Sequence, residues 1–125
     1  MGQVEYVIKD ENGIPYRHIF AFNTAEELAD LIDLDSLLSV TEIADCVMGE
    51  LSDDDINDLG AIPFNELLTL HNSGLGQDIR NTFGLWIENN PNVAFHPDDT
   101  SMDVLTLLWK ACQAKVQLTS QVMKF

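Results

Sequence analysis

Residues 3–22 read QVEYVIKDENGIPYRHIFAF, and this stretch decides the fold class. Apolar side chains recur at every second position in residues 3–9 and again in residues 14–22, which is typical of strands with one buried face. Asn12 and Gly13 between them accept the positive φ angles of a tight turn. The stretch therefore predicts a β-hairpin. Because an isolated hairpin is marginal in water, we expect it to pack on helices through Tyr6, Ile8, Phe20 and Phe22.

The rest of the chain has apolar residues at helical spacing. A Ser or Thr followed three residues later by an acid predicts helix starts at Thr24, Ser39 and Thr100. Further helices are expected over residues 52–60, 63–72 and 75–88. Gly60 is expected to end the first of these three, because glycine commonly follows the last helical residue.

Two short segments have other patterns. Residues 93–95 are a candidate third strand, and the last ten residues fit either a helix or a strand. The length of 125 residues fits one domain. The sequence thus predicts a single α+β domain over residues 1–125, in which an N-terminal β-hairpin packs on about five α-helices. Its parts are the hairpin (about residues 3–22), an acidic helical segment (about 23–66) and a further helical segment (about 64–115).

The charge of the chain is strongly negative and unevenly distributed. There are 21 acidic and 6 basic residues, which gives a formal net charge of −15. Residues 23–66 contain no Lys or Arg, although ordinary solvated helices mix both signs of charge. The acidic residues of this stretch are Glu26, Glu27, Asp30, Asp33, Asp35, Glu42, Asp45, Glu50, Asp53, Asp54, Asp55, Asp58 and Glu66.

Two interpretations of the acidic segment are open. It is either a solvated helix surface or a surface that binds a basic protein, because a field of this sign repels nucleic acid and attracts cationic proteins. The second interpretation predicts an inhibitor that neutralises a nucleic-acid-handling partner, as immunity proteins against nuclease toxins and phage DNA mimics do. The expected partner-binding residues are Glu26, Glu27, Asp30, Asp33, Asp35, Asp45, Glu50, Asp53, Asp54, Asp55 and Asp58.

The second half of the chain carries a motif of uncommon residues. Residues 74–86 read GLGQDIRNTFGLW, and residues 96–101 read HPDDTS. This order resembles an uncharacterised bacterial and phage domain family with the pattern G-L-G-x-x-I-R-N-x-x-G-L-W followed by H-P-D-D-x-S. The resemblance covers about residues 64–115. It implies a common folding unit and carries no known activity.

The residues of this motif have a structural and a functional interpretation. Arg80 is the only cation between Arg17 and Lys110, so Asp98 or Asp99 is expected to pair with it and hold the fold together. In the alternative, a small-ligand or enzymatic site is built from this motif. The residues considered for either role are Arg80, Asn81, Trp86, His96, Asp98 and Asp99.

Other classes of function lack their signatures. Residues 96–99 resemble the His-Pro-Asp-Asp zinc motif of LmbE-like deacetylases, but Thr100 stands where that family has a glutamate. Cys46 and Cys112 fit two free thiols, and no metal site, cofactor or enzymatic activity is expected. No apolar run is long enough for a membrane span, and residues 1–6 lack a signal-peptide pattern. We therefore expect a cytoplasmic protein that contacts neither membranes nor nucleic acid directly.

Overall fold

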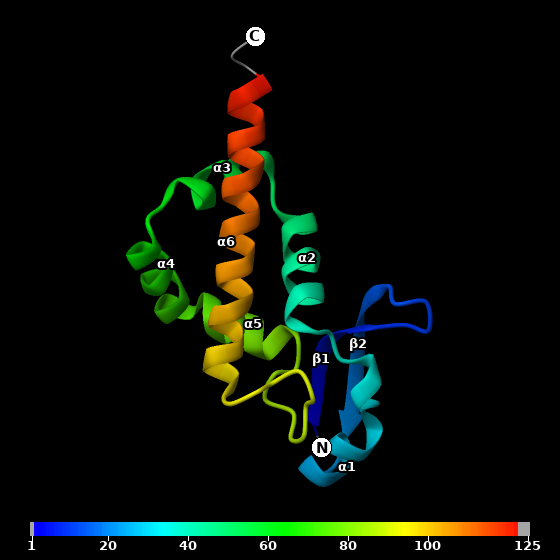
Figure 1. Ribbon diagram of the computed structural model, residues 1–125. Coiled ribbons are helices and arrows are strands. Elements are labelled where there is room, and N and C mark those ends of the chain that lie inside the picture. Colours follow the sequence, from blue (N-terminus) through cyan, green and yellow to red (C-terminus); the bar gives the residue numbers. More distant parts are fainter. Residues whose placement is uncertain (1, 123–125) are drawn as a thin grey trace.

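The N-terminal hairpin is present in the computed structural model, which describes residues 2–122 (Figure 1). Strands β1 (Gly2–Lys9) and β2 (Pro15–Phe22) pair antiparallel, with Tyr6 opposite His18. The turn between them is held by Asp10, whose Oδ1 accepts the backbone N–H groups of Asn12 at 2.8 Å and of Ile14 at 2.9 Å. Gly13 takes a φ of 79°, which a residue with a side chain rarely adopts.

The centre of β1, from Tyr6 to Ile8, is buried on both faces. Tyr6 and Ile8 pack with Phe20 in one apolar cluster, together with Ile32 and Leu37. The expectation that these three hairpin residues pack on helices is confirmed, and Phe22 is half-buried. Val7, on the opposite face, belongs to a second cluster beneath the long helices. Strand β1 therefore contacts helical elements on both faces at its centre, whereas β2 is mostly exposed and buries only Phe20.

The first three α-helices after the hairpin begin where the capping residues predict. Thr24 caps α1 (Ala25–Leu31), and its hydroxyl accepts the Glu27 N–H at 3.1 Å. A short 3₁₀ turn, η1 (Leu34–Ser36), follows. Full capping boxes open the next two helices, α2 (Val40–Glu50) from Ser39 and α3 (Asp53–Ala61) from Ser52. The last helices are α4 (Phe64–Leu70), the π-type turn η2 (His71–Leu75), α5 (Gly76–Thr82) and α6 (Pro97–Val122).

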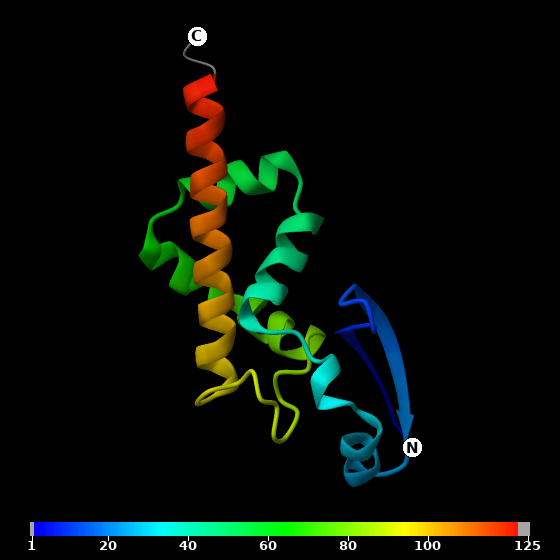
Figure 2. The same cartoon turned by 45° about the vertical axis from the view of Figure 1, so that its right-hand side comes forward.

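Helix α6 organises the helical part of the molecule. It runs along the centre, with α2 on one side and α4 on the other (Figure 1), and α3 and α5 also contact it. Its Val104 joins the cluster that contains Val7, whereas Leu105, Leu108 and Cys112 join a third cluster with Ile56 and Leu67. Figure 2 shows the hairpin at one side of this helical assembly, next to η1. Because α4, η2 and α5 are continuous apart from a kink at Gly74, the described residues form five helical segments besides η1, and the predicted α+β fold is confirmed.

Two predicted helix ends are wrong. Helix α3 continues through Gly60 to Ala61, because Gly60 serves a close helix contact instead: a Cβ there would come within 3.0 Å of the Cys112 carbonyl oxygen. Helix α5 ends at Thr82 and not near residue 88, because Gly84 turns the chain with a φ of 65°. This turn buries Leu85 and leaves the Trp86 side chain 52% exposed.

The start of α6 and the candidate third strand also differ from the expectation. Helix α6 begins at Pro97, and the ring Nδ1 of His96 accepts the Asp98 N–H at 3.0 Å. Proline fits the first turn of a helix because it needs no N–H partner, so Thr100 lies inside the helix and does not cap it. Residues 93–95 form a loop and not a strand. Phe95 in this loop is 90% exposed, because no sheet covers its side chain. Of the last ten residues, those up to Val122 are helical, and residues 123–125 lie outside the described part of the chain.

Candidate functional site

The eleven carboxylates expected to bind a partner are all exposed, but they form two groups. One group surrounds α1 and η1 (Glu26, Glu27, Asp30, Asp33 and Asp35), and the other lies at the end of α2 and on α3 (Glu50, Asp53, Asp54, Asp55 and Asp58). Helices α1 and α3 lie at opposite ends of the molecule in Figures 1 and 2, and Asp45 lies on α2 between them. The acidic segment is thus not one continuous surface.

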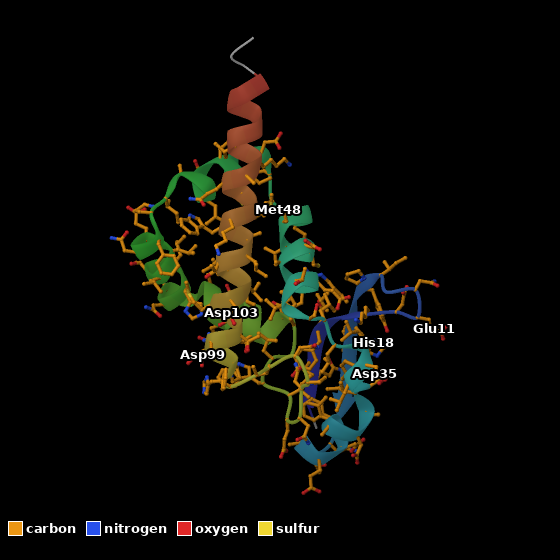
Figure 3. The ribbon with its side chains drawn as sticks, viewed as in Figure 1. Glu11, His18, Asp35, Met48, Asp99 and Asp103 are labelled. Carbon is orange, nitrogen blue, oxygen red and sulfur yellow. The ribbon has the colours of Figure 1, made fainter. Side chains whose placement is uncertain are left out.

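Carboxylates outside this segment extend the negative surface. Figure 3 shows Glu11 on the hairpin turn near Asp35, whereas Asp99 and Asp103 project from the base of α6 on the other side of the molecule. Carboxylates therefore lie also on the hairpin turn and at the base of α6. Within residues 2–122, Lys9, Arg17 and Arg80 form ion pairs with Glu42, Glu5 and Asp98, and none of these three acids is among the eleven expected binding carboxylates.

One acidic residue of the segment does have a cation. Lys9 at the end of β1 donates to both carboxylate oxygens of Glu42, at 2.9 and 3.1 Å, so a cation from outside residues 23–66 offsets this carboxylate. The Lys9 ammonium, and then the Ser39 backbone N–H, lower the pKa of Glu42. This ion pair joins the hairpin to the first turn of α2, and sequence reasoning restricted to local charges could not find it.

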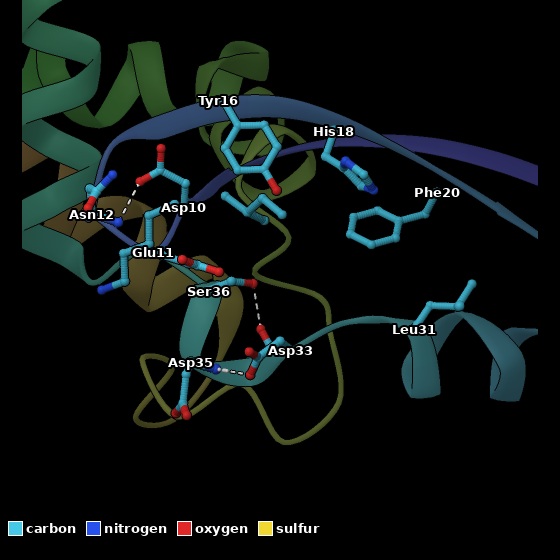
Figure 4. Close-up of a pocket in the computed structure, with 13 residues that line it drawn as sticks. Asp10, Glu11, Asn12, Tyr16, His18, Phe20, Leu31, Asp33, Asp35 and Ser36 are labelled. Carbon is cyan, nitrogen blue, oxygen red and sulfur yellow. Dashed lines mark hydrogen bonds between the residues drawn. The ribbon is translucent and has the colours of Figure 1, made fainter.

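A groove lies between the hairpin and η1, and we call it the hairpin groove. It has a volume of about 850 Å³. Figure 4 shows Tyr16, His18 and Phe20 in a row along β2, opposite Leu31 and Asp33. Its lining consists of Ile8, Lys9, Asp10, Glu11, Asn12, Gly13, Tyr16, His18, Phe20, Leu31, Asp33, Asp35 and Ser36. Only Asp33 and Asp35 of these were expected at a binding surface.

The hairpin groove combines aromatic walls with carboxylates. The rings of Tyr16 and His18 are 5.9 Å apart, and those of His18 and Phe20 are 4.5 Å apart, both edge to face. Leu31 on the opposite wall is 50% exposed and Tyr16 is 42% exposed, so both offer apolar surface to a ligand. Turn-forming hydrogen bonds fix the position of two carboxylates: Oδ1 of Asp10 accepts from the hairpin turn, and Oδ1 of Asp33 accepts the Asp35 N–H.

Several motif residues surround Arg80 in a network of hydrogen bonds, an ion pair and ring contacts, which we call the Arg80 network. The Arg80 side chain is 12% exposed, and its Nη1 lies 2.9 Å from Asp98 Oδ1. The same Nη1 donates to the Ser101 hydroxyl at 2.9 Å, and that hydroxyl lies 2.7 Å from Nε2 of His71. The guanidinium also lies 5.5 Å from the centre of the Trp86 ring. The network ties η2, α5 and the first turn of α6 together.

Of the remaining motif residues, His96 belongs to this network, whereas Asn81 and Asp99 do not. His96 joins the network, because its ring stacks edge to face on Trp86 at 6.0 Å and its Nδ1 lies 3.6 Å from Asp98 Oδ2. Asn81 is exposed and faces a shallow depression beside β1, away from Arg80. Asp99 is exposed and, among the described residues, forms no ion pair with Arg80. Arg80 and Asn81 therefore line different depressions of the described surface.

Sequence reasoning missed two members of this network, His71 and Ser101. They lie thirty positions apart, so only the tertiary fold brings their side chains together. Ser101 is completely buried and is therefore out of reach of a substrate, despite its contact with a histidine. A cleft of about 270 Å³ beside Arg80 contains His71, Asn72, Gly74, Gln77 and Asp98 in its lining. The Arg80 Nε atom is buried and has no hydrogen-bond partner among the described residues.

The described residues offer few sites for other chemistry. Among residues 2–122, no group of three or more His, Cys, Asp or Glu side chains is arranged to hold a metal ion. Cys46 is half-buried and Cys112 is buried, and both are free thiols whose pKa values are raised by burial. None of the helices in the described part of the chain combines the length and the apolar character that crossing a bilayer requires.

Comparison with known proteins gives no relative from which a function can be transferred. No family model, no curated protein and no solved structure matches the chain. The function must therefore be inferred from the geometry and charge of the chain itself.

Proposed function

We propose that this protein binds a basic protein partner through its exposed carboxylates and is not an enzyme. The observation that supports the proposal is that eleven exposed carboxylates lie in residues 23–66, a stretch without Lys or Arg, while Lys9, Arg17 and Arg80 pair with other carboxylates. Surface charges that serve only solubility do not require so complete an exclusion of cations. Opposite fields accelerate the encounter of two proteins and favour the correct partner, so a basic surface is the natural complement.

The partner is a protein that handles nucleic acid, such as a nuclease. Such a protein has a basic groove for phosphates, and exposed carboxylates can occupy that groove and exclude the nucleic acid. The protein would then act as an inhibitor of the toxin-immunity or anti-defence type, by DNA mimicry. Its free cysteines fit the reducing cytoplasm, which we propose as its compartment.

The alternative of a ligand-binding or enzymatic site around Arg80 has less support. Arg80 is occupied by Asp98 and Ser101, and Asn81 faces another surface. Ser101 is buried and cannot act as a nucleophile on a substrate from solution. The geometry of the network therefore favours a structural role.

The test is affinity capture from the native host with matched variants. The immobilised wild type is compared with D53N/D54N/D55N/D58N and with E26Q/E27Q/D30N, at low salt and at about 0.5 M salt, where charges are screened beyond about 3–5 Å. We expect the wild type to retain a basic nucleic-acid-binding protein at low salt, and double-stranded DNA to displace it. At least one variant should retain less of that protein. Retention that changes with neither salt, substitution nor DNA contradicts the proposal.

A further inference from the structure

We infer that the hairpin groove is the docking site for an arginine-bearing segment of the basic partner. The inference rests on the proposed function, because it assumes a cationic partner, but it commits to one place and one type of side chain. The groove lies on the sheet face that carries Tyr16, His18 and Phe20, and its other wall comes from the segment that joins α1 to η1.

The size and the walls of the groove suit an extended peptide segment. A volume of about 850 Å³ is within the range of sites that enclose a ligand of several functional groups. The Tyr16 ring and the Leu31 side chain are each about half exposed, although both lie beside a buried apolar cluster. An occupant with an aliphatic stem would cover this apolar surface, as arginine does with its three methylene groups.

The charge of the groove requires a cationic occupant. Four carboxylates contribute to its lining (Asp10, Glu11, Asp33 and Asp35). The one lysine in the lining, Lys9, forms an ion pair with Glu42 on α2, so its charge is compensated by a carboxylate outside the groove. Asp10 and Asp33 each use Oδ1 to hold a turn, and among the described residues Oδ2 of each accepts no hydrogen bond. These oxygens are held in place before a ligand arrives, which lowers the entropic cost of binding.

The combination of rings and carboxylates favours arginine over lysine. A guanidinium is planar, stacks on aromatic faces and donates two parallel hydrogen bonds to one carboxylate. A lysine ammonium is a compact point charge and cannot stack on a ring while it donates two parallel hydrogen bonds to one carboxylate. The second acidic group, on α3, has carboxylates but no large exposed aromatic side chain among its own residues, so it offers charge without stacking.

The experiment is a titration of the intact protein with peptides of equal length. A Gly-Arg repeat is compared with the Gly-Lys repeat of equal charge and with an uncharged Gly-citrulline repeat, and amide chemical shifts are followed by NMR. The arginine peptide should shift the amides of β2 and η1 and bind about two- to fivefold more tightly than the lysine peptide, which is the scale of one exposed cation–π contact. The citrulline peptide should not bind.

Matched variants distinguish binding in the hairpin groove from attraction by the overall negative charge of the protein. Tyr16→Leu should abolish the preference for arginine while binding of the lysine peptide stays unchanged. D33N/D35N should weaken arginine binding more than D54N/D58N, which removes the same charge from α3. Asn at position 33 can still accept the Asp35 N–H, so the fold is retained.

Each outcome decides between the groove and the wider proposal. If the two double variants weaken binding equally, or if Tyr16→Leu leaves the arginine preference intact, the groove inference is overturned and binding to the general acidic surface stands. If the groove discriminates between the peptides but no basic protein is captured from the host, the groove inference stands and the proposed function is wrong. If neither cationic peptide shifts any amide, the groove inference is overturned.

Discussion

Gly60 in α3 lies so close to Cys112 in α6 that a Cβ on Gly60 would come within 3.0 Å of the Cys112 carbonyl oxygen and 3.1 Å of Val116 Cγ2. The obstacle is backbone, so the helices could accommodate a side chain only by moving apart. Helices α3 and α6 share the apolar cluster of Ile56, Leu108 and Cys112, and a shift there would open it. Gly60, which the sequence suggested as a helix terminator, therefore allows two helices to pack closely.

Gly60→Ala should lower the free energy of unfolding by about 1–3 kcal/mol, because the strain outweighs alanine's better helix propensity. Gly49→Ala is the matched control, since Gly49 also lies in a helix but has nothing within 4 Å of an added Cβ. That variant should be more stable by about 0.5–1 kcal/mol. Urea unfolding of both variants checks the pair, and a stabilised Gly60→Ala would show that α3 does not approach α6 this closely.

Arg80→Ala should lower the free energy of unfolding by about 2–3 kcal/mol, because two hydrogen bonds from a buried cation are lost. Asp98 is 55% exposed and can be solvated afterwards, which limits the loss. Lys110→Ala, which removes an exposed cation, should change stability by less than about 0.5 kcal/mol. Denaturant unfolding measures both, and an unchanged stability for Arg80→Ala would refute the structural role of the network.

Glu42 should make stability depend on pH. Its pKa in the folded protein is lowered by Lys9, so the ionised form stabilises the fold at neutral pH. That contribution is lost as pH falls below the usual glutamate pKa of about 4.3 and through the lower folded value. The free energy of unfolding should therefore differ between wild type and Glu42→Gln at pH 7, and the difference should disappear in acid. Glu66→Gln, at an exposed position on α4, is the control and should show no such pattern.

The two cysteines should react at different rates with a thiol reagent. Burial raises the pKa of both thiols, and Cys112 is fully buried, whereas Cys46 is partly accessible. A disulfide reagent should modify Cys46 first, and Cys112 should react only when the native structure opens. Cys46→Ser should remove the fast phase. A fast phase that survives this substitution would place an accessible thiol at Cys112.

Local signals predicted the elements of this fold well. The helix starts at Ser39 and Ser52 were predictable because the capping side chain and the N–H groups it accepts lie within four residues. The boundaries at Gly60 and Pro97 were not, because a close helix contact decides the first and the His96 ring acts in place of a typical cap at the second. Alternation along β1 identified the face of Tyr6 correctly, yet the burial of Val7 on the other face depends on helices that come much later in the chain.

The candidate sites were predictable only in part. A pairing of Arg80 with Asp98 or Asp99 followed from the scarcity of cations, and only the structure identifies Asp98 as the partner. The hairpin groove was not predictable, because it needs the strand face of Tyr16 and the turn of Asp33 to lie opposite each other. The division of the acidic residues between two ends of the molecule likewise depends on how α2 separates α1 from α3 (Figure 1).

The double burial of β1 has a consequence for how the chain folds during its synthesis. Val7 packs in a cluster with Phe83, Leu85 and Val104, which lie 76 to 97 positions further along the chain. While the ribosome is still making the middle of the protein, the Val7 side chain therefore lacks part of its apolar cover, and a two-stranded hairpin is marginal alone. The earliest residues to emerge must wait for some of the latest before they become stable. A nascent chain stalled ahead of α6 should accordingly leave the hairpin open to proteases, even though its strands have long left the ribosome.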